Sequence, residues 1–539
     1  MKTYAAPLIG IALSLCLCLK ASVPRLALVV VFDQMRGDYL WRWQPFWKGG
    51  FQKLTAEGFA YRNCFIRHAA TVTCAGHATI STGAPPEQHG ISGNTIVAKC
   101  CKRFLIGCAE DTTGVPSTIW LQLPAVGDLL RQQFPGAKVV SLSHKARAAI
   151  MMGGHTPTAV LWLDPEHGKL VSMPGLSKPR WLDEWNRLYS PQQYAGKVWY
   201  PSLPAALAPS DSVPWEPRFP GGTCSFPHRV PTEEAEFWDG FLLSPYSVEW
   251  LFNAARNAVT HERLGMDSIP DLLWISISTT DFLGHQFGPD SRELLELYLA
   301  CDRALGEFIR FLDSAVGRSQ YVLVLTSDHG VAPIPEMLAR SSPGAYPGID
   351  AGRISLDDLT TFLHRKLTQA FGPRAGIFWL SLAPPLLLLH RNLIEGAGVR
   401  PDDVRDSLQL WLTNYEGIGI VVPDVALRNS ISHTATGVSD SLLALLRRTF
   451  PPSQTADLLL YPRPFWIFGT EAATTHGTPY DYDRFVPLVF FGNTVTGGSS
   501  AEPTSPEDIA PTIATLLGVS IPTATGKALL LRSAERTQP

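Results

Sequence analysis

Three apolar runs, each followed by an aspartate, constrain the fold of this chain more than any other feature of its sequence. Runs of this kind are typical of strands buried on both faces, as in a parallel sheet. They cover residues 26–32, 272–278 and 321–326, and the acids that follow them are Asp33, Asp281 and Asp328. Open α/β sheets carry their sites at the carboxyl ends of the strands, so these acids are candidate site residues. A helix cap is the ordinary alternative for a single acid in this place.

Helical patterns lie between and after these strands. The strongest covers residues 291–316, where apolar residues recur at helical spacing along one face. Another covers residues 505–517, with Ser505 as its cap. Shorter strands are predicted at 138–141, 159–163 and 486–491. Strands that alternate with helices predict an α/β fold with a doubly wound, mainly parallel sheet.

Two segments interrupt this pattern. Residues 165–245 are rich in proline, tryptophan and tyrosine and weak in periodicity, which indicates an irregular cap over one edge of the domain. Residues 333–462 have helical patterns of their own at 356–371 and 401–415, which indicates an inserted α+β lobe. The expected parts of the main domain are residues 22–332 and 463–539.

The N-terminus is typical of an export signal. Lys2 precedes an apolar run at residues 5–19, which is shorter than the roughly 20 residues that span a bilayer. We expect residues 1–21 to be a signal peptide cleaved near Ala21. The mature protein would then be periplasmic or secreted, with no membrane span. An uncleaved anchor and a lipid-anchored form are the alternatives.

Charge and composition narrow the classes of function. The chain of 539 residues has a formal net charge of −3 at pH 7. It has no basic run with interleaved aromatic residues, so we expect no nucleic-acid-binding module.

Nine cysteines are present, and an exported protein can keep disulfides. Three of them lie within one short stretch and could form a local bridge: Cys100, Cys101 and Cys108. Cys301 lies on the apolar face of the predicted helix at 291–316 and is expected to be a core residue.

Three histidines join the aspartates as candidate metal ligands. Asp281 and His285 are four residues apart, so one helical turn would point both side chains the same way. His329 directly follows Asp328, and His476 begins a His-Gly-Thr-Pro-Tyr loop. Zinc favours nitrogen and oxygen donors of this kind. Three Asp and three His, with one threonine oxygen, would suit two zinc ions that clamp the attacking and leaving oxygens of a phosphoryl transfer.

Thr73 is the candidate nucleophile, within the run Ala70-Thr71-Val72-Thr73-Cys74-Ala75-Gly76-His77. A threonine hydroxyl is almost fully protonated at neutral pH, so it needs a metal ion or a base beside it. A metal ion held by the candidate Asp and His ligands would meet that need. Taken alone, Thr71 and Thr73 are typical of a polar helix start, because threonine often caps helices.

The order of these motifs resembles the alkaline phosphatase superfamily. More narrowly, it resembles the type I phosphodiesterase/nucleotide pyrophosphatase branch and its phosphate-irrepressible alkaline phosphatases. The matching segments are 31–36, 71–83, 89–94, 143–149, 280–285, 326–330 and 476–480. The resemblance implies two zinc ions, of which one would take Asp281, His285 and His476. The other would take Asp33, Asp328, His329 and the oxygen of Thr73. It also implies in-line attack by Thr73 through a phosphothreonine intermediate.

Three further residues bear on which phosphate ester is cleaved. A phosphate monoester is a dianion, so its hydrolase gains from added positive and hydrogen-bonding groups. Lys145 and Arg147 follow a predicted strand and could both reach one oxyanion, while Asn94 would donate to another phosphate oxygen. Solvated loop cations and a turn asparagine are the ordinary alternatives. The resemblance implies the functional role, because monoesterases of the family carry Lys and Arg here and its diesterases lack them.

The predicted function is therefore hydrolysis of small-molecule phosphate monoesters by a metal-dependent phosphatase. A phosphodiesterase or nucleotide pyrophosphatase on the same fold is the first alternative, and Lys145 and Arg147 argue against it. A binding or structural protein on an inactivated scaffold is the second, and the complete set of candidate ligands argues against that.

Overall fold

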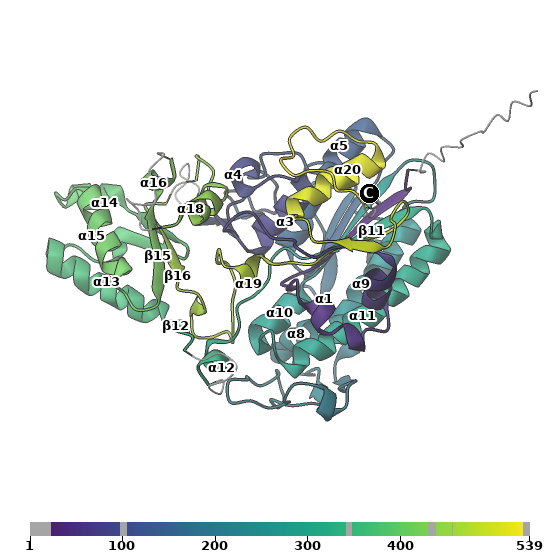
Figure 1. Cartoon of the computed structure of the whole chain (residues 1–539), viewed down its shortest axis with the longest axis horizontal. Coiled ribbons are helices and arrows are strands. Elements are labelled where there is room, and N and C mark those ends of the chain that lie inside the picture. The colour runs from purple at the N-terminus through teal and green to yellow at the C-terminus, as the bar shows by residue number, and fades with distance from the viewer. Residues whose placement is uncertain (1–22, 98–104, 341–347, 429–437, 455, 532–539) are drawn as a thin grey trace, which may run out of the picture.

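A mixed sheet of nine strands forms the middle layer of the larger part of the molecule, on the right in Figure 1. The computed structural model describes residues 23–97, 105–340, 348–428, 438–454 and 456–531. The predicted signal peptide at residues 1–21 lies outside these ranges. The strands lie in the order β19-β2-β18-β11-β1-β10-β5-β6-β7. Their bounds are β1 (Leu26–Phe32), β2 (Phe59–Tyr61), β5 (Val139–Ser143), β6 (Ala159–Asp164), β7 (Lys169–Ser172), β10 (Asp271–Ile277), β11 (Tyr321–Thr326), β18 (Leu488–Gly492) and β19 (Gly498–Ser500).

Five neighbouring strands of this sheet are parallel. β1 pairs in parallel with β10 on one side and with β11 on the other, and the parallel pairing continues from β10 to β5 and β6. β18 is antiparallel to β11 and β2, β7 is antiparallel to β6, and β19 is parallel to β2. The predicted α/β fold with a mainly parallel sheet is confirmed. The three apolar runs form its adjacent central strands.

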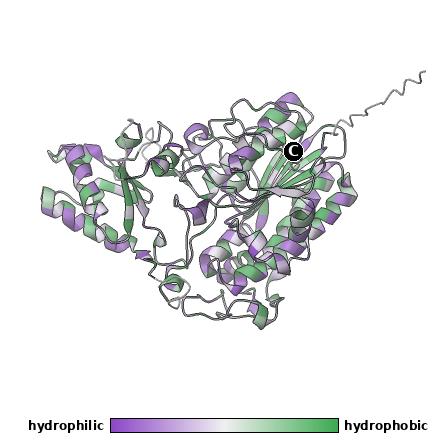
Figure 2. Cartoon of the chain, viewed as in Figure 1, coloured by the Kyte–Doolittle hydropathy of each residue, from purple (hydrophilic) through white to green (hydrophobic). Residues whose placement is uncertain are grey.

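Helices cover both faces of this sheet, which explains why its central strands are apolar throughout. Alternate side chains of β1 enter two different cores, the even-numbered residues on one face and the odd-numbered residues on the other. The helices are α9 (Pro245–His261) and α11 (Arg292–Leu312) on the first face, and α5 (Val126–Gln133) and α20 (Ile509–Leu517) on the second. In Figure 2 the strands are mostly green, the colour of hydrophobic residues.

The two long helical patterns differ from the observed helices only at their ends. Ser291 caps α11 as its position predicts, because its hydroxyl accepts from the Leu294 N–H at 3.1 Å. α20 begins later than predicted, after a 3₁₀ turn at Pro506–Asp508. Pro511 lacks the N–H that would bond to the Glu507 carbonyl in an α-helix, so the turn before α20 is wound differently.

A second, antiparallel sheet is built by the segment predicted to be an inserted lobe (Figure 1). Its strand order is β13-β14-β16-β15, with β13 (Leu380–Ala383), β14 (Leu386–Leu389), β15 (Ile418–Pro423) and β16 (Leu458–Pro462). The helices α13 (Leu356–Phe371) and α15 (Pro401–Thr413) match the predicted helices and pack on this sheet in a core of their own. The domain limits themselves, including 333 and 462, stay predictions.

Residues 165–245 contain only short elements, in keeping with an irregular cap. The longest is α8 (Glu234–Leu242). Aromatic side chains of this segment, such as Trp181, Trp185 and Phe237, join the same core as α9 and α11. The segment is therefore packed onto the main domain. Within the described ranges, none of the helices combines the length and apolar character that a bilayer crossing requires.

One buried carboxylate holds α2 (Gly50–Glu57) against α11. Asp302 accepts hydrogen bonds from the N–H groups of Lys48, Gly49 and Phe51, each at 2.7 Å. We predict that Asp302→Ala lowers the free energy of unfolding by about 3 kcal/mol, because three backbone donors lose their acceptor in a place with little access to water. Denaturant titration of both proteins measures this difference.

Glu307→Ala is the matched control on the same helix. The Glu307 side chain is 58% exposed and its ion pair with Arg256 spans 3.5 Å, so its loss should change the unfolding free energy by less than about 0.5 kcal/mol. Equal effects of the two substitutions would contradict the role given to Asp302.

Candidate metal centre and active site

The three aspartates that follow the apolar runs meet at one edge of the central sheet. Asp33 comes directly after β1, and Asp328 comes shortly after β11. Asp281 lies in α10 (Thr279–Phe287), which begins just after β10. β1 lies between β10 and β11, and the three strands run in parallel. Parallel pairing therefore brings acids from three distant segments to the carboxyl end of the sheet, where α/β folds place their sites.

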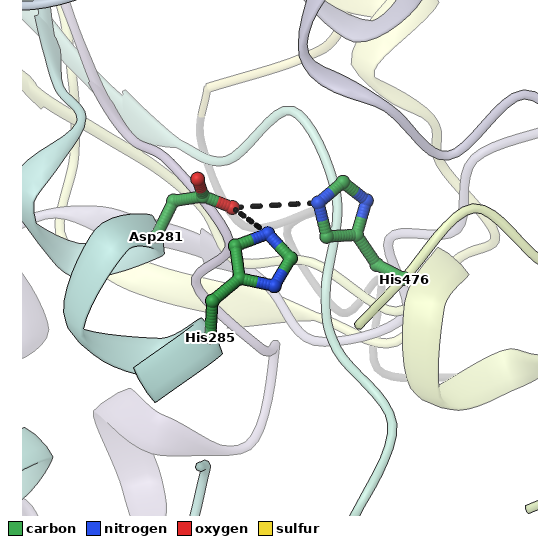
Figure 3. A group of neighbouring side chains, drawn as sticks. All are labelled: Asp281, His285 and His476. Atoms are coloured by element: carbon green, nitrogen blue, oxygen red, sulfur yellow. Dashed lines mark ion pairs between the residues drawn. The ribbon is translucent and has the colours of Figure 1, made fainter. Parts of the chain in front are cut away.

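Asp281, His285 and His476 form the first group of donors (Figure 3). Asp281 Oδ1 lies 3.2 Å from His285 Nε2 and 3.4 Å from His476 Nε2. The Nδ1 atoms of the two rings lie 2.9 and 2.7 Å from the carbonyl oxygens of Thr474 and Thr71. A ring that donates its Nδ1–H to a carbonyl leaves Nε2 as the lone-pair donor that a metal ion needs.

Asp33, Asp328 and His329 form the second group of donors. His329 Nε2 lies 3.3 Å from Asp33 Oδ1 and 3.4 Å from Asp328 Oδ2. All three side chains are fully buried. Asp33 Oδ1 and His329 Nε2 have no hydrogen-bond partner among the described residues, and Asp328 Oδ2 has His77 Nδ1 at 3.2 Å. Buried polar atoms without partners are rare and costly, and a cation held between the three residues would satisfy both. His329 Nδ1 lies 3.0 Å from the Gly330 carbonyl oxygen, so its Nε2 also faces the group.

The two donor groups are neighbours. The ring centroids of His329 and His476 are 3.6 Å apart, although the rings belong to different groups. Gln34 spans both groups, because its backbone N–H donates to Asp328 Oδ1 at 3.2 Å and its side-chain amide donates to Asp281 Oδ1 at 2.9 Å. The sequence did not identify Gln34, whose only signal was its place next to Asp33.

Glycine at position 284 makes room for Gln34. A Cβ at Gly284 would lie 1.9 Å from Gln34 Oε1. Gln34 itself has a φ of 68°, a left-handed conformation that is uncommon for residues other than glycine. The surrounding hydrogen bonds therefore hold Gln34 in an unfavourable backbone conformation at the centre of the site.

The electrostatics of the second group and of His476 fit metal binding, whereas for His285 the Asp281 carboxylate outweighs burial and raises the pKa. Burial, together with the carboxylates of Asp281 and Asp328, raises the pKa of Asp33 well above its ordinary value. Burial lowers the pKa of His329 to about 3 and also lowers the pKa of His476, so both rings are neutral at pH 7. Neutral imidazole is the form that binds metals. Three close carboxylates, three imidazoles and few protein cations therefore form a donor set suited to divalent ions.

Lys145 is the cation that the protein itself brings to this cluster. Its Nζ donates to Asp33 Oδ2 at 2.7 Å, and it also bonds to Asp281 Oδ2. The ammonium lies 4.9 Å from the centroid of the Phe282 ring. Burial opposes the charged form, but the two carboxylates outweigh it and raise the pKa of Lys145. Lys145 therefore lies between carboxylates of the two donor groups. The sequence predicts a place for Lys145 only beside the bound oxyanion.

Thr73 is the first residue of α3 (Thr73–Thr82), and its side chain is almost fully buried. His77, one turn later, has its Nδ1 2.7 Å from the Thr73 carbonyl oxygen and 3.2 Å from Asp328 Oδ2. A Cβ at Gly76 would lie 2.4 Å from the Asp328 carbonyl oxygen, so only glycine lets the helix pack this closely. The structure thus brings the start of α3 against the second donor group.

Asn94 and Arg147 lie on the segments beside α3. The Cys74 N–H donates to Asn94 Oδ1 at 3.0 Å. Arg147 is in α6 (Ala146–Gly153), and its Nε is buried without a hydrogen-bond partner among the described residues. Within the described ranges, the Arg147 guanidinium has no ion pair with a carboxylate.

The sequence left open a local bridge among Cys100, Cys101 and Cys108, and the structure pairs Cys108 with Cys74 instead. β3 (Thr95–Val97) and β4 (Leu105–Gly107) form a hairpin that returns the chain to Asn94 and so places Cys108 beside the start of α3. Cys100 and Cys101 lie outside the described residues. Cys301 is buried in α11, as predicted for a core residue.

Known proteins are similar to this chain in sequence and in fold. A family model described as type I phosphodiesterase / nucleotide pyrophosphatase matches residues 27–342. The chain belongs to this family. Among relatives of this phosphodiesterase-family protein, alkaline phosphatase PhoV of Synechococcus elongatus is 30% identical over 93% of this chain and 91% of its own length. Alkaline phosphatase PafA of Elizabethkingia meningoseptica is 29% identical over 94% of each chain.

The crystal structure of PafA matches the present fold with a TM-score of 0.84 and 28% identity, over 94% of this chain and 98% of that one. The predicted alkaline phosphatase-like fold and the predicted family are confirmed. As a member of the type I phosphodiesterase family, the protein is a phosphoester hydrolase, and its two donor groups are candidates for the metal cofactor of that chemistry.

We predict that a chelator lowers the midpoint of thermal unfolding by roughly 5–10 °C, since the buried donors lose their compensating cations. Adding divalent metal back should restore the midpoint. Thermal unfolding with and without chelator, together with elemental analysis of the purified protein, measures both effects.

Asp164, Glu166 and His167 form a partly exposed group of similar composition and give a matched control. Asp164→Asn should leave the metal content and the chelator effect unchanged, whereas Asp328→Asn should reduce both. A wild-type protein that contains no metal and unfolds at the same temperature with and without chelator would disprove the assignment.

Proposed function

We propose that the chain is an exported, zinc-dependent phosphate monoester hydrolase, an alkaline phosphatase that acts on small-molecule esters through Thr73. The observation that carries the proposal is the packing of the start of α3 against the second donor group, where His77 contacts both the Thr73 carbonyl and Asp328. The names of PhoV and PafA, which match this chain over more than nine-tenths of its length, support the same activity.

Two zinc ions are the proposed cofactor. The first ion would be held by Asp281, His285 and His476, and the second by Asp33, Asp328, His329 and the hydroxyl oxygen of Thr73. When bound, the ions supply positive charge that favours ionisation of the threonine hydroxyl and offsets the charge on the departing oxygen. The partnerless atoms of the second group support this assignment.

The covalent chemistry is assigned to Thr73. Its Oγ1 forms a bond to phosphorus as the bond from phosphorus to the ester oxygen breaks, which gives a phosphothreonine and an alcohol. A water oxygen then displaces Thr73 Oγ1 from phosphorus, which releases inorganic phosphate and regenerates the enzyme. The N-terminus of α3 favours the negative charge that develops on the phosphoryl oxygens.

Asn94, Lys145 and Arg147 are the proposed phosphoryl-binding side chains. The amide oxygen of Asn94 already accepts from the Cys74 N–H, so its amide nitrogen is the end left to donate. Arg147 Nε has no hydrogen-bond partner among the described residues, so the guanidinium can donate to a bound anion. A dianionic monoester gains more from two nearby cations than a monoanionic diester does. Hydrolysis of diesters is the second candidate, which the description of the family favours.

Export is part of the same proposal, with residues 1–21 as the signal peptide and the periplasm or the cell exterior as the destination. The disulfide between Cys74 and Cys108 supports it, because disulfides persist in oxidising compartments.

The experiment compares para-nitrophenyl phosphate with bis-para-nitrophenyl phosphate on the zinc-loaded enzyme. We predict a higher kcat/KM for the monoester. Arg147→Ala should lower kcat/KM at least 100-fold for the monoester and less than 10-fold for the diester. The diester carries less negative charge, so its transition state gains less from the arginine. Steady-state kinetics on both substrates measures the split.

Thr73→Ala should abolish turnover of both substrates and the phosphorylated intermediate, which mass spectrometry of acid-quenched enzyme detects. Arg187→Ala, a largely exposed arginine with only a 4.0 Å ion pair, is the control and should change neither rate. An equal loss on the two substrates in Arg147→Ala would count against the monoester assignment. Retention of a phosphorylated intermediate in Thr73→Ala would exclude Thr73 as the nucleophile.

A further inference from the structure

A small cavity of about 170 Å³ lies beside the candidate active site. Three stretches of chain supply most of its lining residues: the residues before Thr73, the loop that carries Asn94, and the β13–β14 hairpin of the second sheet. Its walls include Val72, Asn94, Leu386, Phe450, Tyr461 and Gly477. The inserted segment and the main domain thus share this cavity.

The cavity adjoins the positions assigned to the reaction. Val72 directly precedes Thr73, and Gly477 directly follows His476. These two walls lie close together, because a Cβ at Gly477 would be 3.4 Å from Val72 Cγ1. If the phosphoryl group of a substrate contacts Thr73 and Asn94, the organic group attached to its ester oxygen can enter the cavity.

The walls of the cavity are mainly apolar, with one unsatisfied polar group. Leu386, Phe450 and Tyr461 are among the apolar and aromatic residues that line it. Tyr461 is 1% exposed, and its hydroxyl has no hydrogen-bond partner in the described part of the chain. Buried hydroxyls normally have a partner, so this hydroxyl is free to bond to a polar atom of a ligand. An apolar cavity of about 150 Å³ is large enough to hold benzene, so this cavity has room for one compact ring.

We propose that this cavity binds the organic group of the phosphate ester and selects a compact aromatic or branched aliphatic group. A polar substituent on that group would accept a hydrogen bond from the Tyr461 hydroxyl. The proposal rests on the proposed function and narrows it to a class of substrate. Esters with long, highly charged organic groups fit the cavity poorly, because its walls offer no charged side chain among the described residues.

Two phosphonates test the cavity without turnover. Phenylphosphonate and methylphosphonate present the same anionic group, and only the first carries a ring. Calorimetric titration of the zinc-loaded enzyme should show at least 10-fold tighter binding of phenylphosphonate. Ala383→Phe, which fills the cavity from the hairpin, should remove this preference and leave the affinity for methylphosphonate unchanged.

Leu386→Ala is a second variant, which removes one apolar wall and should reduce the preference several-fold. Leu393→Ala, on the exposed surface of the second lobe, should keep it. Equal affinity of the wild type for the two phosphonates would overturn the cavity assignment and leave the phosphatase proposal standing. Failure of both phosphonates to bind, with no hydrolysis of para-nitrophenyl phosphate, would overturn the proposed function itself.

The Cys74–Cys108 disulfide lies directly beside Asn94. Both of its cysteines hold the same residue: the Cys74 N–H donates to Asn94 Oδ1, and the Cys108 N–H donates to the Asn94 backbone carbonyl, each at 3.0 Å. The disulfide joins these two cysteines directly. The side chain and the backbone of Asn94 are thus fixed by one covalently closed unit.

We infer that the Cys74–Cys108 disulfide is a positioning device for Asn94. With the amide oxygen held on α3, the amide nitrogen of Asn94 is oriented to donate to a phosphoryl oxygen. Opening the disulfide would release the β3–β4 hairpin from α3 and let the Asn94 amide rotate. This inference also rests on the proposed function.

A double-mutant cycle separates positioning from general stabilisation. Cys74→Ala with Cys108→Ala should lower kcat/KM for para-nitrophenyl phosphate about 10-fold when Asn94 is present. The same pair of substitutions should lower it less than 2-fold in the Asn94→Ala background, where nothing is left to position. Reduction of the wild type under native conditions, followed by thiol counting, should reproduce the first effect without any substitution.

Thermal unfolding of all four proteins is the accompanying readout, since loss of the disulfide should lower the midpoint equally in both backgrounds. If loss of the disulfide lowers kcat/KM by the same factor with and without Asn94, the disulfide is merely structural and the inference is overturned. A wild type that does not hydrolyse the substrate would instead overturn the proposed function.

Discussion

The concentration of negative charge at the carboxyl end of three parallel strands is the constraint on which the rest of the structure depends. Asp33, Asp281 and Asp328 are all buried there, where unpaired carboxylates are costly. Lys145 compensates part of the charge, and the orientation of three imidazoles leaves their Nε2 atoms facing the remainder. The sheet, its covering helices and the late loop of His476 therefore converge on a place that requires cations.

The site combines rigid and variable parts of the fold. Five of its donor side chains come from strand ends and from α10, which belong to the core of the main domain, and the sixth, His476, comes from a later loop. The groups that bear on the organic part of a substrate come from elsewhere: the Asn94 loop, closed by a disulfide, and the hairpin of the second sheet. The proposed cavity for the organic group therefore lies mainly outside the central sheet, whereas the Asn94 loop takes part in both proposed roles.

Much of the fold was predictable because strands buried on both faces leave a continuous apolar signal, as residues 26–32 do. The candidate donors were predictable because aspartate and histidine just after such strands are recognisable by type and place. The strands β2, β7 and β19 were missed, since three or four residues are too short to show a period. The Cys74–Cys108 pairing depends on where the chain returns after β3 and β4, which residue types do not show. The role of Gln34 depends on its left-handed backbone conformation, which residue types do not show either.

The order of the donors along the chain has a consequence for how the site is assembled. A chain is synthesised and folds from its N-terminus, so Asp33, Asp328 and His329 are all available before the second sheet exists. His476 follows that sheet in the chain, so the first donor group stays incomplete until the inserted segment has been made and the chain has returned to the main domain. The donors of the second group thus all precede the inserted segment in the chain, whereas the first group is completed by His476, which follows it.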